Sequence, residues 1–294
     1  MKSLKLGLIG LGSMGSEMAT KFLTAGYRLT VYDIDANRLQ GSFASGAKIA
    51  ESSTHLTQTV DVVMTSLRSS AVWETVTENE LLPLARTDQI FIDFGTSRVD
   101  PTQRLAKAFQ AKSATLLDVP VSGGPLGIRN GDLHMFGGGC RHQFNQCLDL
   151  FKVIGCPQRI VYCGPSGSGQ IVKGVNQLAM GLSAAAYLEA VAFGVNNGIE
   201  LEAIGQAVGG DSGWRKHLKQ IVDRIQKEQG NQVYVKFPEL PYFLDEADRQ
   251  GYSIPLTQAL YEFCRQGDLI VADNMGRDSQ PFWYSLRTLV KPKN

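Results

Sequence analysis

Polar residues recur on one face of a predicted helix in the middle of the chain. Lys173, Asn176, Gln177 and Met180 share that face by i, i+3 and i+4 spacing in GSGQIVKGVNQLAM. A lysine amine can exchange a proton with a bound molecule if it sits in a suitable site. Most helical lysines are solvated surface groups, but apolar residues surround Lys173, which lies near an expected hinge. The pattern therefore favours a lysine placed in a cleft between two domains.

A second motif precedes this helix, in DVPVSGGPLGIRNGDLHMFGG from Asp118 to Gly138. Ser122, Gly123 and Gly124 stand just before Pro125, which suits the first turn of a helix. Adjacent glycine N–H groups, a serine hydroxyl and a helix start make an anion cradle that matches a substrate carboxylate. A tight turn without a ligand is the alternative, because glycine pairs usually only bend the chain.

A third motif opens the chain, as a strand, a glycine-rich turn, a helix and a second strand. Gly10 permits the turn, Gly12 lets the backbone approach a pyrophosphate, and Gly15 lets the helix pack close to the sheet. Asp33 ends the second strand, where its carboxylate can accept hydrogen bonds from ribose hydroxyls and would repel a 2′-phosphate. NAD is thus favoured over NADP, although Arg28 and Arg38 could reverse that choice. The predicted cofactor turn comprises Gly10, Leu11, Gly12, Ser13, Met14 and Gly15.

The elements that must position these motifs alternate between strand and helix over the first half of the chain. Strand-like runs continue at residues 60–65, 90–94, 115–119 and 133–137, with a helix at 144–153, which predicts a parallel sheet. Helical periodicity alone fills the second half, at residues 170–197, 201–208, 214–228, 239–250, 256–267 and 279–289. We therefore predict a Rossmann-type, doubly wound parallel-sheet domain (residues 1–165) joined by a long interdomain helix to an all-α substrate and oligomerisation domain (residues 166–294).

Part of that long helix imitates a membrane span. The run Leu178–Val195 is long and apolar, but Glu189 lies inside it and Asn196 and Asn197 follow it. We expect a helix that is apolar on most faces and buried against other helices of the chain or of a second subunit.

Composition excludes several classes of function. The 294 residues carry a net charge of +1, and the lysines and arginines are dispersed, so no nucleic-acid or membrane partner is expected. Five cysteines form no CxxC pair, which suggests reduced thiols and a cytoplasmic location. No metal site is expected, because the histidines lack ligand spacing, and no GxSxG elbow indicates a serine hydrolase. The histidines are His55, His134, His142 and His217.

Together, the three motifs resemble those of the β-hydroxyacid dehydrogenase family over nearly the whole chain. The resemblance implies hydride transfer between NAD and a small hydroxy acid, with Lys173 as the catalytic general acid and base. It implies that Ser122, Gly123 and Gly124 contact the substrate carboxylate and that Asn176 or Gln177 orients the substrate. It also implies that Thr96, in DFGTS, lies near the nicotinamide ribose, and that the chain forms a homodimer or homotetramer.

The chain departs from the family pattern at three places. Gln177 stands where many relatives carry asparagine, and the tripeptide at 238–240, Pro-Glu-Leu, replaces a Lys-Asp-Leu signature whose lysine is expected beside the substrate. The basic segment WRKHLKQ offers only Trp214, Arg215 and His217 as further candidates. A catalytically silent NAD-binding sensor or scaffold and an imine reductase are therefore the alternatives. Lys173 argues against the second, since imine reductases that resemble this chain usually replace that lysine.

Overall fold

The computed structural model describes residues 4–44, 46–227 and 237–265, which divide into two compact units. The first unit is Met1–Gly174 and the second is Val175–Asn294. The division falls inside helix α9 (Ser168–Asn196), whereas the sequence pattern sets the domain boundary just before that helix. The difference arises because Gly169, Gln170 and Lys173, in the first turns of α9, all contact residues of the first unit.

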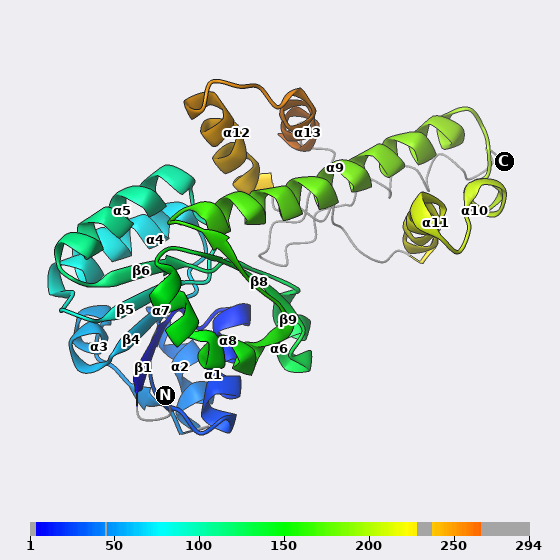
Figure 1. Cartoon of the computed structure of the whole chain (residues 1–294). Helices are drawn as coiled ribbons and strands as arrows, with labels where there is room; N and C mark the ends of the chain where they lie inside the picture. The colour runs from blue at the N-terminus through cyan, green and yellow to red at the C-terminus, as the bar shows by residue number, and fades with distance from the viewer. Residues whose placement is uncertain (1–3, 45, 228–236, 266–294) are drawn as a thin grey trace. The chain divides into compact units, whose positions relative to one another are not determined.

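A nine-stranded sheet forms the centre of the first unit (Figure 1). Strands β3, β2, β1, β4, β5 and β6 lie side by side in that order, and all are parallel. The predicted parallel sheet is confirmed for five of these strands, and β3 adds one that the sequence pattern does not predict. The strands are β1 (Lys5–Ile9), β2 (Arg28–Tyr32), β3 (Lys48–Ile49), β4 (Val62–Thr65), β5 (Ile90–Asp93), β6 (Thr115–Asp118), β7 (Val121–Ser122), β8 (Leu133–Gly138) and β9 (Gly155–Gly164).

The far edge of the sheet departs from strict parallel winding. Strand β8 runs antiparallel to β6 and β7 and parallel to β9. The reversal follows the short helix α6 (Gly124–Asn130), which ends at Gly131 in the left-handed conformation, so the chain turns back without a full crossover.

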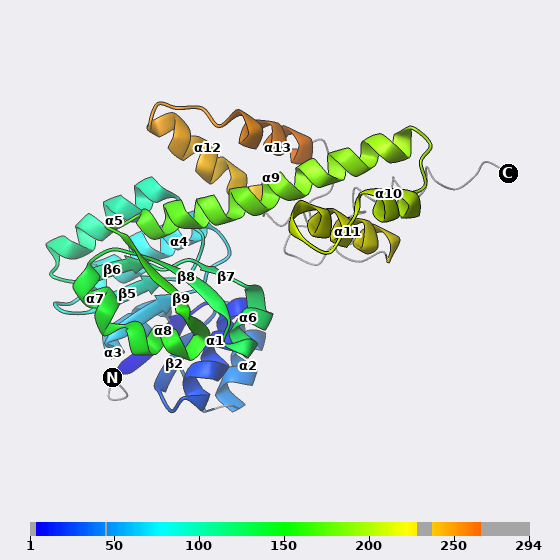
Figure 2. The same ribbon diagram turned by 45° about the vertical axis from the view of Figure 1, so that its right-hand side comes forward.

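Helices cover both faces of the sheet because successive strand residues point to opposite faces. Leu8 and Met64 belong to one core, with α1 (Ser13–Thr24), while Ile9 and Val63 belong to the other, with α5 (Val99–Ala111). Figure 2 shows α5 and α1 on opposite sides of the sheet. The remaining helices are α2 (Ala36–Ala44), α3 (Ser53–Thr59), α4 (Ser70–Val76), which continues through η1 (Thr77–Leu81) and η2 (Leu82–Leu84), α7 (Arg141–Gln146) and α8 (Leu148–Ile154). The single helix predicted at 144–153 is therefore two helices that meet at Cys147.

The described part of the second unit is entirely helical. Leu188 and Val191 of α9 pack with Ile221 and Val222 of α11 and with Leu240 of α12 in its core. The helix predicted at 279–289 lies outside the described residues. The elements that follow α9 are α10 (Leu201–Val208), α11 (Gly213–Gln226), η3 (Phe237–Glu239), α12 (Leu240–Arg249) and α13 (Pro255–Arg265).

Its own chain covers helix α9 along one stripe, so cover of the other faces by a second subunit stays a prediction. Within residues 178–195, burial follows one narrow stripe, and Phe193 is 75% exposed. Of the described helices, α9 alone is long and apolar enough to cross a membrane by length and composition. Glu189 lies within it, and core helices of proteins that never meet a membrane pass the same test.

Candidate active site

Two glycines at the turn between β1 and α1, Gly10 and Gly15, could not carry a side chain without a clash. Gly10 has a φ of +94°, and a Cβ added there would lie 2.4 Å from the carbonyl oxygen of Ser66, at the end of β4. A Cβ on Gly15 would lie 1.9 Å from the carbonyl oxygen of Gly10. The turn therefore lies at the carboxyl ends of β1 and β4, where the winding of the sheet reverses and doubly wound folds bind ligands.

The start of α1 suits an anion. Gly12 is the N-cap, with no side-chain hydrogen bond to cap the helix, and the first turn holds no acidic residue. The N–H groups of the first turn and the positive end of the helix dipole then remain to receive a phosphate. A Cβ on Gly12 would have only the Arg38 Nη1 atom within reach, at 4.0 Å, so the space beside this residue is open.

Asp33 follows β2 and is 7% exposed. Its Oδ2 atom accepts a 2.6 Å hydrogen bond from the N–H of Leu11, and its Oδ1 atom accepts one of 2.9 Å from the N–H of Asp35. Each carboxylate oxygen has a second lone pair that can accept a hydroxyl. The Arg38 guanidinium lies 3.7 Å from the same carboxylate and 3.3 Å from that of Asp35. The open glycine turn, the uncapped helix start and the buried acid together fit a dinucleotide.

The predicted carboxylate motif forms a bent loop tied to the cofactor helix. Ser122 ends β7, Gly123 follows with a φ of +130°, and Gly124, the first residue of α6, has a φ of +65°. Arg129 of α6 donates a 2.8 Å hydrogen bond from Nε to the carboxylate of Glu17 on α1. This ion pair fixes the helix after the serine–glycine loop against the helix after the glycine turn.

Lys173 lies inside the first unit rather than on its surface. The residue is 6% exposed, and its Nζ atom donates a 2.9 Å hydrogen bond to the carbonyl oxygen of Val121. Val121 directly precedes Ser122, so the structure brings the amine to the serine–glycine loop. Two motifs that lie about fifty residues apart in the chain thus meet at one place.

Two buried carboxylates at adjacent strand ends hold the surrounding backbone. Asp93 of β5 and Asp118 of β6 face each other in the sheet register. Asp93 accepts hydrogen bonds from the Ser97 hydroxyl (2.7 Å) and the Gly95 N–H (3.0 Å), whereas Asp118 accepts from N–H groups at the start of α9. Burial raises the pKa of Asp93 to about 6 and that of Asp118 to about 7.

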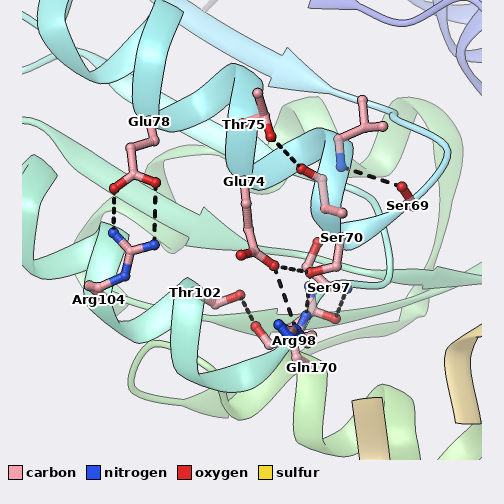
Figure 3. Close-up of polar contacts among 12 residues, drawn as sticks. Ser69, Ser70, Glu74, Thr75, Glu78, Ser97, Arg98, Thr102, Arg104 and Gln170 are labelled. Carbon is pink, nitrogen blue, oxygen red and sulfur yellow. Dashed lines mark hydrogen bonds and ion pairs between the residues drawn. The ribbon is translucent and has the colours of Figure 1, made fainter. Parts of the chain in front are cut away.

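Gln170 joins α9 to the loop that contains Thr96 (Figure 3). Its Oε1 atom accepts a 2.9 Å hydrogen bond from the Ser97 N–H, and its Nε2 atom donates one of 3.0 Å to the Gly95 carbonyl oxygen. Thr96 lies between these two residues and is half-buried. On its other side the loop is held by Ser70, whose hydroxyl accepts from the Arg98 N–H at 2.9 Å.

A separate polar cluster lies in the second unit. The Gln177 Nε2 atom donates a 3.2 Å hydrogen bond to the carboxylate of Glu239, and the Asn176 Nδ2 atom donates one of 3.1 Å to the Gln177 Oε1 atom. Gln177 and Glu239 are both buried. The Pro-Glu-Leu tripeptide therefore places a buried acid against the amide of Gln177.

The remaining candidates make contacts of a structural kind. The Arg215 guanidinium lies 4.6 Å from the Trp214 ring centroid and donates a hydrogen bond to the Val208 carbonyl oxygen, and the His217 ring packs against Tyr187. Over the described ranges, no three His, Cys, Asp or Glu side chains gather closely enough to hold a metal ion.

Two family profiles match the chain. One, described as the NAD binding domain of 6-phosphogluconate dehydrogenase, matches residues 5–164. The other, described as "NAD-binding of NADP-dependent 3-hydroxyisobutyrate dehydrogenase", matches residues 167–279. The chain belongs to the β-hydroxyacid dehydrogenase family. A nicotinamide cofactor and the oxidoreductase class follow from this membership.

Relatives in this family cover most of the chain. The uncharacterized oxidoreductase YkwC of Bacillus subtilis is 30% identical over 285 residues, which is 93% of this chain and 96% of that protein. A 3-hydroxyisobutyrate dehydrogenase of Pseudomonas aeruginosa is 31% identical, over 72% of this chain and 72% of that protein. An NAD-dependent L-serine dehydrogenase of the same organism is also 31% identical, over 71% of this chain and 70% of that protein. The match spans only 61% of a probable mitochondrial 3-hydroxyisobutyrate dehydrogenase of Dictyostelium discoideum, or 66% of this chain.

Solved structures confirm the fold. A 3-hydroxyisobutyrate dehydrogenase of Mycobacterium tuberculosis with L-serine has a TM-score of 0.81, with 20% identity and coverage of 98% of this chain and 99% of that one. An imine reductase of Bacillus cereus has a TM-score of 0.62 at 19% identity, with the same coverage. The Rossmann domain followed by a helical domain is therefore shared by enzymes of both kinds.

Gln170, Asp93 and Asp118 are parts of the site that the sequence motifs do not predict. One signal could have found Gln170, since it precedes Lys173 by three residues and so shares the same helical face. The two aspartates end the observed strands β5 and β6, one residue before the predicted ends, but nothing local to them indicates which N–H groups they accept from.

Proposed function

We propose that the protein is an NAD-dependent dehydrogenase of small β-hydroxy acids in which Lys173 is the general acid and base. The observation that carries the proposal is the buried Lys173 amine, hydrogen-bonded at 2.9 Å beside the Ser122–Gly124 loop. A lysine held away from solvent at a site with anion-binding N–H groups suits proton exchange with an alcohol that carries a carboxylate.

Each part of the site has a role in this proposal. The Ser122 hydroxyl and the N–H groups of Gly123 and Gly124 bind the substrate carboxylate. The bound nicotinamide would accept hydride from the carbinol carbon, or return it in the reverse direction. In oxidation, neutral Lys173 accepts the hydroxyl proton at Nζ, and in reduction its ammonium form returns that proton to the carbonyl oxygen. Asn176 and Gln177 orient the substrate, and Thr96 contacts the nicotinamide ribose.

We propose NAD rather than NADP as the cofactor. A 2′-phosphate would bring negative charge to the buried carboxylate of Asp33, whereas ribose hydroxyls can donate to it. Arg38 already lies between the carboxylates of Asp33 and Asp35, so its charge is shared before any phosphate arrives. The turn of α1 contributes the N–H groups of Ser13 and Met14 to the pyrophosphate.

The names of the relatives suggest a substrate class. 3-Hydroxyisobutyrate, L-serine and 2-(hydroxymethyl)glutarate, named for three of the relatives, are carboxylic acids with a hydroxymethyl group on the carbon next to the carboxylate. We propose the same arrangement for the substrate here. Pro238 stands where relatives carry a lysine that is expected beside the substrate. We therefore propose that this chain differs from its relatives in the remaining substituent that its substrate carries.

A turnover assay tests the proposal against its rivals. The protein is incubated with NAD or NADP and with 3-hydroxyisobutyrate, L-serine, 2-(hydroxymethyl)glutarate and related acids, and NADH or NADPH absorbance is recorded. We expect oxidation of at least one acid, with a higher kcat/KM for NAD. NAD binding without turnover of any acid would favour a sensor, and reduction of cyclic imines alone would favour an imine reductase.

A further inference from the structure

The side chain of Gln170 bridges two segments that the proposed reaction must keep in register. Gln170 is 1% exposed and lies in the first turn of α9, three residues before Lys173. Its amide makes hydrogen bonds to Gly95 and Ser97, the neighbours of Thr96. The chain separates these partners by more than seventy residues, so only tertiary structure brings them together.

Its partners fix the orientation of this amide. The Ser97 N–H can only donate and the Gly95 carbonyl oxygen can only accept, so the amide oxygen must face the first and the amide nitrogen the second. A carboxylate or an apolar side chain of the same length would leave at least one of these backbone groups without a partner.

The start of α9 packs closely against the sheet. Asp118 accepts a 2.9 Å hydrogen bond from the Gly167 N–H and one of 3.2 Å from the Gln170 N–H. A Cβ on Gly169 would lie 2.3 Å from the Phe136 carbonyl oxygen and 2.6 Å from that of Asp118. The helix thus packs directly against two strands, and the Gln170 side chain adds hydrogen bonds to the loop after β5.

We propose that Gln170 is a positioning residue, which holds the helix that carries Lys173 in register with the Gly95–Ser97 loop. The inference rests on the proposed function, in which the amine and that loop flank the reacting atoms. Lys173 follows Gln170 by three residues on the same helical face, so any shift of the helix against the loop also shifts the amine. Misplacement of a reacting group by about 1 Å can lower a rate about a hundredfold.

Three variants test this role. Gln170→Leu removes both hydrogen bonds, and Gln170→Glu keeps an acceptor for the Ser97 N–H but can donate to the Gly95 carbonyl oxygen only when its carboxyl group is protonated. Gln103→Leu is the matched control, because the Gln103 Nε2 atom also holds the segment before α9, through a 3.3 Å hydrogen bond to the Ser166 carbonyl oxygen.

We expect Gln170→Leu to lower kcat by about tenfold to a hundredfold, with the KM of the hydroxy acid changed by less than about threefold. The primary deuterium isotope effect on kcat should rise, because the chemical step becomes slower relative to the others. Gln103→Leu should leave kcat within about twofold of the wild type.

The pH profile of Gln170→Glu separates positioning from loss of stability. Two carboxylates favour the protonated acid: Asp118, which accepts from the Gln170 N–H, and Asp93, which accepts from the Ser97 hydroxyl. Arg98, which is paired with Glu74 beside the loop, and Lys173, three residues along the helix, oppose them. The ratio of variant to wild-type kcat should therefore rise as pH falls toward about 5, since protonation restores the donor to Gly95. Circular dichroism at each pH checks that both proteins stay folded.

The outcomes distinguish the two claims. An active wild type with unaltered kcat in Gln170→Leu, or a flat ratio for Gln170→Glu, would overturn the positioning role alone. A wild type that oxidises none of the acids overturns the proposed function, and the positioning role with it.

Discussion

At Gly12, we expect a substitution to affect cofactor binding without affecting the stability of the fold. Its backbone, with φ of −63° and ψ of −170°, has a conformation that any residue can adopt. An added Cβ would lie no closer than 4.0 Å to another atom. The added methyl group should therefore affect only a pyrophosphate that approaches this backbone. Gly15 is different, because a Cβ there would overlap the Gly10 carbonyl oxygen.

We expect Gly12→Ala to weaken NAD binding at least about tenfold, or about 1.4 kcal/mol, with an unchanged melting temperature. Calorimetric titration with NAD and thermal unfolding measure the two effects. Gly15→Ala is the comparison variant and should lower the melting temperature itself. Wild-type affinity in Gly12→Ala would show that the pyrophosphate does not approach this residue.

At the scale of elements, burial raises the pKa of two carboxylates at the junction of β5, β6 and α9. The pKa of Asp118 rises from its ordinary value of 3.8 to about 7 in the folded protein. Because the folded protein holds this proton more tightly than the unfolded chain does, the group stabilises the fold below pH 3.8, and that contribution is lost as pH rises through about 7.

We predict that Asp118→Asn, which is neutral at every pH, removes this dependence. The free energy of unfolding of the wild type minus that of the variant should fall by about 2–3 kcal/mol from pH 5 to pH 8, as measured by urea unfolding. Glu246→Gln provides a control that should show no change over this range: burial raises the pKa of Glu246, but hydrogen bonds from Arg249 and Gln250 outweigh it and hold the pKa below 4.5, so the contribution of this group is lost only at lower pH. A constant difference across this range would mean that Asp118 stays ionised.

Local periodicity predicted the elements but not the contacts among them. The strands β1, β2, β4, β5 and β6 follow from apolar runs bounded by turns, and Gly10 and Gly15 follow from the close approach their spacing implies. The direction of β8 depends on a left-handed turn at Gly131. The chain has many glycines, so the presence of a glycine at this position does not predict that turn. The role of Gln170 was not predicted for a related reason, because its partners Gly95 and Ser97 lie far away in the chain.

At the scale of the whole molecule, α9 presents more apolar surface than its own chain covers. Phe193 is 75% exposed and Val175 62% exposed, whereas Leu188 and Val191 are buried. Exposed apolar residues along one helix are typical of a surface that a second subunit covers. We therefore propose a homodimer or homotetramer in which α9 forms part of the interface.

We expect Phe193→Glu to shift the protein toward monomers without loss of helix content. Light scattering after size-exclusion chromatography measures the mass, and circular dichroism measures the helix content. Glu202→Lys, on the exposed face of α10, is the control and should keep the wild-type mass. An unchanged oligomer in Phe193→Glu would place the interface elsewhere, and a monomeric wild type would exclude it.

The central claim is that the buried amine of Lys173 exchanges the substrate proton, and single-turnover NADH formation by Lys173→Ala tests it most directly. We expect turnover to fall by about a hundredfold to ten-thousandfold, with NAD binding nearly unchanged. Lys152→Ala, at an exposed lysine paired with Asp149 on α8, should keep wild-type rates. Wild-type turnover in Lys173→Ala would contradict the account, because no proton could then depend on this amine.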